Sequence, residues 1–305
     1  ILLSYGGTVP KAAWPPRKES PRRLLFGLLE WQVSNLLRFV ISVFVISGFL
    51  ITGLLIDDLE DNVRLKRFYV RRSFKIIPHY IFIIFIGFLA SHYLFPNKTY
   101  EVSSILSYFL FFQNYAIPIP MLGHLWSIAV EEHFYFLYPL ILTSICLITK
   151  NTCLRKRILF ASFILLIGLG NYLRYLVFQN VHSINDPTVW QVTHLRFDGL
   201  IFGSLLKLSE PYLDSLPLKI KSFFSKLCFI LGAGIFIFFM HQFNKIGWYY
   251  YSLTYFAAGF LIISALLDFS PLVAMTENKV LRYIGKNSYG IYLWHYIIKL
   301  PIVRL

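Results

Sequence analysis

The sequence has few charged residues and very few cysteines. Only 14% of its 305 residues are Asp, Glu, Lys or Arg, whereas 57% are hydrophobic and 18% are aromatic. So little polar side chain cannot cover the surface of a soluble globule, which excludes an ordinary soluble enzyme. The three cysteines have no short paired spacing, which argues against a disulfide framework and against a zinc site, and we expect no bound metal. They are Cys146, Cys153 and Cys228.

Acidic residues are about half as numerous as basic ones. The chain has 15 Asp and Glu against 29 Lys and Arg, a formal net charge of +14. In a soluble protein this excess would indicate nucleic-acid binding, but the basic residues lie between apolar runs and form none of the usual nucleic-acid motifs. Connections that face anionic lipid on the cytoplasmic side explain them better. We therefore expect membrane lipid, and no nucleic acid, as a partner.

The first 35 residues contain no apolar run. They begin with Ile1 instead of Met, and they are basic and rich in proline. No apolar region precedes a small-residue cleavage site, so this segment does not resemble a signal peptide. We interpret 1–35 as an atypical segment, either of a fragment or of a chain with a non-authentic start, and 36–305 as the transmembrane domain.

Apolar runs of membrane-spanning length recur from Leu36 onward. Leu36–Ile56 has about the twenty residues that a bilayer core requires. The pattern predicts an all-α, polytopic transmembrane helical bundle with about eight to nine membrane segments. Ser104–Tyr115 is too short to cross comfortably. If this segment does not cross the membrane, all four basic connections can be cytoplasmic, as the positive-inside rule requires. These connections are 57–75, 150–157, 207–226 and 268–286.

One stretch places ionisable side chains within an apolar setting. Residues 124–139 read HLWSIAVEEHFYFLYP. On a helix, His124, Ser127 and Glu131 share one face, and Glu132 points about 100° away. Ionisable groups at membrane depth usually line a pathway or cavity, so these four residues are candidates for a functional site. The alternative is that both carboxylates are solvated at the headgroup level and help to begin a helix.

Three cations stand close together in the sequence before a predicted span. Arg71, Arg72 and Lys75 precede Pro78, which we expect to begin the next helix because its missing N–H falls in an unsatisfied first turn. The cations either anchor the connection to lipid phosphates or hold the phosphates of a nucleotide-like cofactor. Charge alone leaves both interpretations open.

Further polar residues interrupt the later apolar helices. Arg196 and Asp198 are two residues apart, so on a helix they do not face each other and each needs another partner. In the last helix, Ser288, Tyr292 and His295 form a polar stripe that must face protein or water. His295 is either a substitute base or a core histidine with satisfied hydrogen bonds.

Small residues recur in two of the apolar runs. Gly48 lies in FVISGFLITG, and Gly199 and Gly203 form a small-xxx-small pair in LRFDGLIFGSLL. Such residues let neighbouring helices approach closely, and this is the interpretation we favour over ligand contact. No repeat of fixed period is visible, so the inverted-repeat pattern of many transporters is not evident.

Five motifs together resemble the acyltransferase-3 family of integral membrane acyltransferases, which move acetyl or other short acyl groups onto sugars and surface polymers. They occur in the family's order and cover roughly residues 44–295. The motifs are FVISGFLITG (44–53), RRSFKIIPHY (71–80), GHLWSIAVEEHFYFLYP (123–139), LRFDGLIFGSLL (195–206) and IGKNSYGIYLWH (284–295).

The resemblance implies roles for particular residues. The cations would bind the donor substrate, which is acetyl-CoA or another acyl-CoA. Lys75 stands in place of the second arginine of the family's pair, and a lysine cannot form the bidentate contact with phosphate that an arginine forms. Catalytic roles are implied for His124, Ser127, Glu131, Glu132 and His295. Donor binding is implied for Arg71, Arg72 and Lys75. Substrate-binding roles are implied for Trp126, Arg196, Asp198 and Tyr292.

The resemblance also implies an acceptor and a location. It predicts acyl transfer to a carbohydrate hydroxyl of a lipid-linked or cell-surface polysaccharide, such as lipopolysaccharide, at a bacterial inner membrane. Family members carry an arginine and a histidine in a first helix, whereas the first histidine here is His79. The resemblance therefore implies that this helix is missing, and it leaves open whether the chain is active as it stands. The alternatives are a glycan transporter or flippase, and a non-catalytic scaffold.

Overall fold

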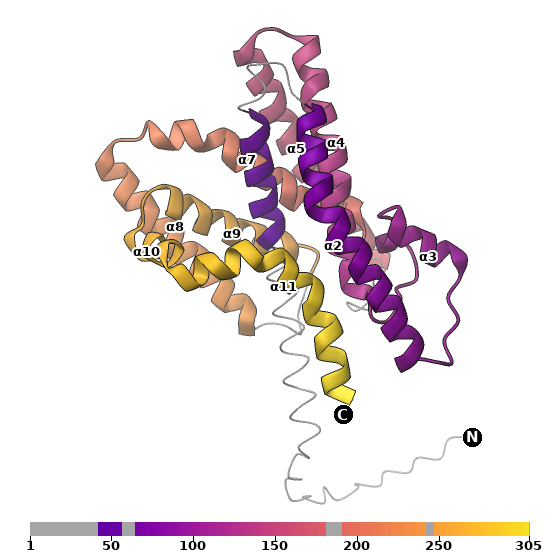
Figure 1. Cartoon of the computed structure of the whole chain (residues 1–305). Coiled ribbons are helices and arrows are strands. Elements are labelled where there is room, and N and C mark those ends of the chain that lie inside the picture. The colour runs from indigo at the N-terminus through magenta and orange to yellow at the C-terminus, as the bar shows by residue number, and fades with distance from the viewer. Residues whose placement is uncertain (1–41, 57–64, 181–190, 242–246, 305) are drawn as a thin grey trace, which may run out of the picture. The chain divides into compact units, whose positions relative to one another are not determined.

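The computed structural model describes residues 42–56, 65–180, 191–241 and 247–304, and every regular element in these ranges is a helix (Figure 1). The all-α prediction is therefore confirmed for this part of the chain. The expectations about the segment 1–35 and about a missing first helix fall outside the described residues. The elements are a helix at Ser42–Ile56, α2 (Leu65–Leu94), α3 (Val102–Phe109), η1 (Gln113–Tyr115), η2 (Gly123–Leu125), α4 (Trp126–Ile148), α5 (Thr152–Asn180), η3 (Thr193–Leu195), α7 (Phe197–Asp214), α8 (Leu218–His241), α9 (Tyr250–Leu266), α10 (Ser270–Glu277) and α11 (Lys279–Arg304).

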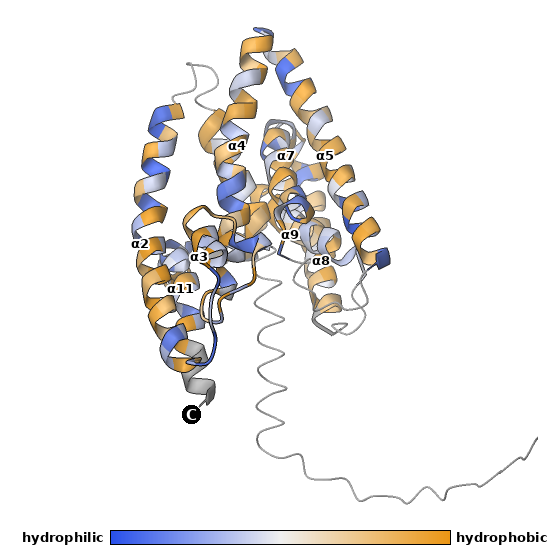
Figure 2. Cartoon of the chain, turned by 90° about the vertical axis from the view of Figure 1, so that its right-hand side faces the viewer, coloured by the Kyte–Doolittle hydropathy of each residue, from blue (hydrophilic) through white to orange (hydrophobic). Residues whose placement is uncertain are grey.

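The helices are apolar on the outside as well as at their contacts. Within the described residues, α2 and the Leu218–Phe239 part of α8 are long and apolar enough to cross a membrane, and Ser42–Ile56 and α9 are shorter apolar helices. Figure 2 shows mainly hydrophobic helices with hydrophilic bands on α2, α4 and α5. With eight residues, α3 is too short to span a bilayer, in agreement with the sequence interpretation. The total number of spans remains a prediction.

Pro78 does not begin a helix, contrary to the sequence prediction. It lies inside α2, which starts thirteen residues earlier at Leu65. A proline removes only its own N–H from the helical ladder, and membrane helices tolerate this where neighbouring groups compensate. The Arg and Lys residues before it are good helix formers, so the helix extends upstream. The three cations are therefore fixed on one rigid helix with the apolar span.

The Ser42–Ile56 helix packs very closely on α7. A Cβ added to Gly48 would lie 1.9 Å from the carbonyl oxygen of Leu200, and one added to Gly203 would lie 2.0 Å from the carbonyl oxygen of Val45. Backbone therefore meets backbone at both positions, which only glycine permits. The predicted packing role of these small residues is confirmed.

We expect Gly48→Ala to destabilise the protein by about 1–3 kcal/mol, because the added methyl group forces the two backbones apart. Gly168→Ala in α5 is the matched control, since nothing lies within 4 Å of its added Cβ. Heating the detergent-solubilised protein and measuring the folded fraction by size-exclusion chromatography checks both variants. Equal midpoints for the two variants would contradict the close packing.

Candidate functional site

The start of α4 and the last helix are joined by a polar contact. The Tyr292 hydroxyl in α11 donates to the carbonyl oxygen of His124, and Ser127 Oγ lies 2.6 Å from the same hydroxyl oxygen. Because the tyrosine uses its one proton on the carbonyl, Ser127 is the donor to Tyr292. His124 lies in η2 and not in α4, yet its ring packs edge-on against Tyr292, with 5.7 Å between ring centroids, so its side chain faces the same partner as Ser127, as their spacing predicted.

The hydrogen bonds of His124 define its tautomer. Nε2 lies 3.1 Å from the carbonyl oxygen of Leu293, which can only accept, so Nε2 carries the proton and Nδ1 carries the lone pair. Nδ1 is buried and has no hydrogen-bond partner among the described residues. The His295 ring lies 5.2 Å from that of His124, centroid to centroid, and its Nδ1 donates to the carbonyl oxygen of Tyr292. Two predicted catalytic histidines are thus brought together.

Glu131 lies one turn further along α4 and is held inside the helix packing. The Tyr135 hydroxyl donates to Glu131 Oε2 at 2.6 Å, a contact typical of an i, i+4 pair. The guanidinium carbon of Arg72 in α2 lies 3.6 Å from the centroid of the Tyr135 ring, a cation–π contact. Residues of α2 and α4 therefore meet beside this carboxylate.

Two polar atoms beside this carboxylate have no partner in the described part of the chain. Glu132 is half-buried, and its Oε1 makes no hydrogen bond to those residues. Arg72 Nε is also buried without a hydrogen bond to those residues. A buried polar atom without a partner costs about 1–3 kcal/mol, so this region is suited to a polar ligand. The contacts of Glu131 favour a functional site over a solvated helix start.

The three cations of α2 do not share one environment. Arg71 and Lys75 are exposed, whereas Arg72 is partly buried against α4. Their separation follows from helical geometry, because residues 71 and 75 lie on one face and residue 72 lies about 100° away. The geometry leaves Arg71 and Lys75 available to a phosphate and places Arg72 beside the carboxylates.

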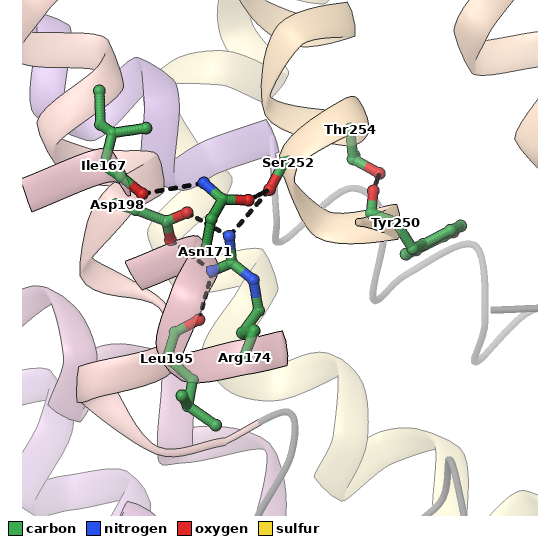
Figure 3. A network of polar contacts seen from close by, with 8 residues as sticks. All are labelled: Ile167, Asn171, Arg174, Leu195, Asp198, Tyr250, Ser252 and Thr254. Atoms are coloured by element: carbon green, nitrogen blue, oxygen red, sulfur yellow. Dashed lines mark hydrogen bonds and ion pairs between the residues drawn. The ribbon is translucent and has the colours of Figure 1, made fainter. Parts of the chain in front are cut away.

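Asp198 has the separate partner that its sequence position required (Figure 3). Arg174 of α5 donates from Nη1 to Asp198 Oδ1 at 2.8 Å and from Nη2 to Oδ2 at 2.5 Å. Arg174 also donates to the carbonyl oxygen of Leu195 and to Ser252 Oγ, both at 2.8 Å. Ser252 in turn donates to Asn171. Both members of the ion pair are completely buried. Because Arg174 lies in α5, Asp198 in α7 and Ser252 in α9, the network joins these three helices.

Arg196 and Trp126 also lie in packed contacts. Arg196 is fully buried, and its guanidinium carbon lies 3.4 Å from the centroid of the Tyr251 ring. Trp126 is buried edge-on to Phe44, with 5.9 Å between ring centroids. A guanidinium over an aromatic face is favourable inside a helix bundle. The contacts of Trp126, Arg196 and Asp198 show that these side chains pack between helices. Their predicted substrate-binding roles remain predictions.

The sequence reasoning missed two residues of these networks. Tyr135 was detectable, because it stands four residues after Glu131 on the same helical face. Arg174 was also detectable, as a charge within an apolar run, but its partner is set by the tertiary structure. Across the described ranges, no group of three or more His, Cys, Asp or Glu side chains is placed to hold a metal ion.

Comparisons with known proteins agree with these motifs. A family model described as an acyltransferase domain, that of the acyltransferase-3 family, matches residues 20–305. Peptidoglycan O-acetyltransferase OatA of Listeria monocytogenes is 32% identical over 272 residues, which are 80% of this chain and 41% of that protein. O-acetyltransferase OatA of Staphylococcus aureus is 31% identical over 199 residues, which are 62% of this chain and 31% of that protein. No solved structure matches.

The chain spans less than half the length of these relatives. The family match, in contrast, extends over nearly the whole chain, and it begins within the basic and proline-rich segment that the sequence analysis set apart. It also includes all five motifs, among them the histidine, serine and carboxylates that meet around the start of α4. The chain belongs to the acyltransferase-3 family of membrane proteins.

Proposed function

We propose that the protein transfers an acetyl group from acetyl-CoA, or another short acyl group from its CoA thioester, to a hydroxyl group of a polysaccharide. The observation that carries this proposal is the state of His124. Its Nε2–H is held by the Leu293 carbonyl, so the buried Nδ1 is a lone-pair nitrogen. A nitrogen of this kind is suited to accept a hydroxyl proton.

The reaction needs one proton acceptor and a stabilised charge. His124 Nδ1 removes the proton of the acceptor hydroxyl, the hydroxyl oxygen bonds to the thioester carbonyl carbon, and the C–S bond breaks. The leaving thiolate then takes up this proton from His124, which restores the neutral ring. Glu131, held by Tyr135, positions the acceptor, and Arg72 supplies positive charge beside it. His295, next to His124, is the second nitrogen base of the site.

Acyl-CoA enters this scheme as the donor substrate. Its phosphates need accessible cations, and Arg71 and Lys75 are exposed on α2. From the basic connections we infer that this end of α2 lies on the cytoplasmic side, where CoA thioesters occur. Lys75 binds as a point charge, without the bidentate geometry of an arginine.

The names of the relatives support a class of acceptor. A relative with 32% identity is named a peptidoglycan O-acetyltransferase. We therefore assign a cell-wall polysaccharide of the peptidoglycan type as acceptor, reached from the outer side of a bacterial cytoplasmic membrane. A lipid-linked precursor of such a polymer carries the same hydroxyls.

A transfer assay tests the function. Membranes containing the full chain are incubated with acetyl-CoA carrying a deuterated acetyl group and with soluble peptidoglycan fragments. We expect mass spectrometry to find the deuterated acetyl ester on the saccharide. Movement of the saccharide across vesicles without any covalent change would instead identify a transporter.

We expect Lys75→Ala to raise the KM for acetyl-CoA about tenfold, which corresponds to one exposed charge-assisted contact of about 1.4 kcal/mol. The KM for the saccharide should stay the same. The matched control is Lys98→Ala, an exposed lysine beyond the other end of α2. Equal effects on the two KM values would count against a phosphate role for this face of α2.

A further inference from the structure

A second group of rings lies beside α4, outside the site described above. It consists of Phe112, Tyr115, His133, Thr193 and His194, here called the aromatic cluster. Ring centroids are 5.0 Å apart for Phe112 and His133, and 5.9 Å apart for Tyr115 and His194, whose rings stack within 20° of parallel. The residues come from the segment at η1, from α4 and from η3, so tertiary packing alone brings them together.

Hydrogen bonds hold this cluster in place. His133 Nδ1 lies 2.7 Å from Thr193 Oγ1, and the buried Asn114 donates to the same oxygen at 2.8 Å. The Tyr115 hydroxyl lies 3.2 Å from His194 Nδ1. η1 and η3 are thereby tied to each other and to α4. These bonds fix the orientation of the Tyr115, His133 and His194 rings.

The outer side of the cluster is open. Phe112 is 54% exposed and Tyr115 is 49% exposed. The backbone before them is strained, because Phe111 has φ 59°, a left-handed conformation that an aromatic residue rarely adopts. The Phe111 ring stacks on Tyr80 at 4.6 Å, which anchors it inward. Such strain costs about 1–3 kcal/mol and often marks a functional segment, and here it precedes the outward-facing Phe112.

The aromatic cluster is separate from the His124 and Glu131 site. His133 follows Glu131 by two residues, about 200° around the helix, so the two side chains leave opposite faces of α4. The basic connections assign the end of α4 near Ile148 to the cytoplasmic side. η1 and η3 are bonded to residues at the other end of α4. The proposed function puts the polysaccharide acceptor on that side of the membrane.

The chemistry of the cluster fits a sugar better than a charged ligand. A pyranose has a C–H face, which packs on an aromatic ring, and hydroxyls around its edge, which bond to imidazole and hydroxyl groups. The cluster contains no Asp, Glu, Lys or Arg. Partial burial lowers the pKa of His194, so its ring is neutral near pH 7. Its Nδ1 pairs with the Tyr115 hydroxyl, and Nε2 is the nitrogen that a sugar hydroxyl can bond to.

We propose that the aromatic cluster is a saccharide-binding subsite, in which Phe112 and Tyr115 stack on a pyranose ring and His194 and Thr193 bond to its hydroxyls. The identity of this saccharide as the acceptor rests on the proposed function. The alternative occupant is lipid at the membrane interface, where tyrosine rings are common.

Binding of an N-acetylglucosamine tetrasaccharide to the detergent-solubilised full chain tests the subsite, by saturation-transfer NMR and calorimetry. We expect Tyr115→Ala to raise the Kd at least tenfold and Tyr115→Phe to raise it about two- to threefold, because the ring is kept. Tyr93→Ala, which removes an exposed ring on α2, should leave the Kd unchanged. Each variant is first checked for an unchanged melting midpoint.

The outcomes separate this subsite from the proposed function. Saccharide binding that needs Tyr115, without any acetyl transfer, supports the subsite and rejects the transferase proposal. Acetyl transfer with an unchanged saccharide KM in Tyr115→Ala rejects the subsite alone. A wild-type chain that does not bind the tetrasaccharide, or variants that alter only lipid-dependent stability, would also overturn the subsite and indicate interface anchoring.

Discussion

Glu131→Gln is expected to lower acyl transfer at least about 100-fold while the amount of folded protein stays the same. Glutamine has nearly the same size, and its carbonyl oxygen can still accept the bond from Tyr135. What is lost is the negative charge beside Arg72, which in the proposed mechanism orients the acceptor hydroxyl toward the base His124. The measurement is the rate of deuterated acetyl transfer in membranes, divided by the folded protein found by size-exclusion chromatography.

Glu101→Gln is the matched control for this variant. Glu101 is an exposed carboxylate before α3, and the Ser103 hydroxyl donates to its Oε2 at 3.1 Å. We expect transfer by this variant to equal that of the unchanged chain. Near-normal product from Glu131→Gln would show that the buried carboxylate takes no part in the reaction.

Asp198→Asn is expected to destabilise the fold by about 3–5 kcal/mol, the usual loss when one member of a buried ion pair is removed. Both side chains of the Arg174–Asp198 pair are excluded from solvent, so the variant leaves a guanidinium charge without its counter-ion (Figure 3). The bonds of Arg174 to Leu195 and Ser252 cannot replace that charge. The melting midpoint of the solubilised protein measures the effect.

The Lys207–Glu210 pair supplies the comparison. It lies on α7, as Asp198 does, but about a quarter of each side chain is exposed. Glu210→Gln should therefore lose no more than about 1 kcal/mol. If Asp198→Asn and Glu210→Gln lower the melting midpoint equally, the buried Arg174–Asp198 pair contributes no more to stability than the exposed pair. Combining Asp198→Leu with Arg174→Met should recover much of the lost stability, because no buried charge then remains.

Local sequence patterns determined much of this protein. Composition and the length of the apolar runs predicted a helical membrane protein, because a chain with 14% charged residues cannot cover itself with polar side chains. The i, i+3 spacing of His124 and Ser127 predicted a shared face, and both side chains contact Tyr292. The two-residue spacing of Arg196 and Asp198 showed that each needed another partner. These are properties of a single helix.

The tertiary structure decided which helices supply the partners. Nothing near Glu131 in the sequence indicates Arg72, and nothing near Asp198 indicates Arg174, since these contacts join helices far apart in the chain. Pro78 was misread for a related reason, because helix continuation depends on neighbours that compensate for the lost N–H. The aromatic cluster likewise exists only because η1, α4 and η3 converge. Helical periodicity sets the direction of a side chain, whereas its partner depends on how the helices pack.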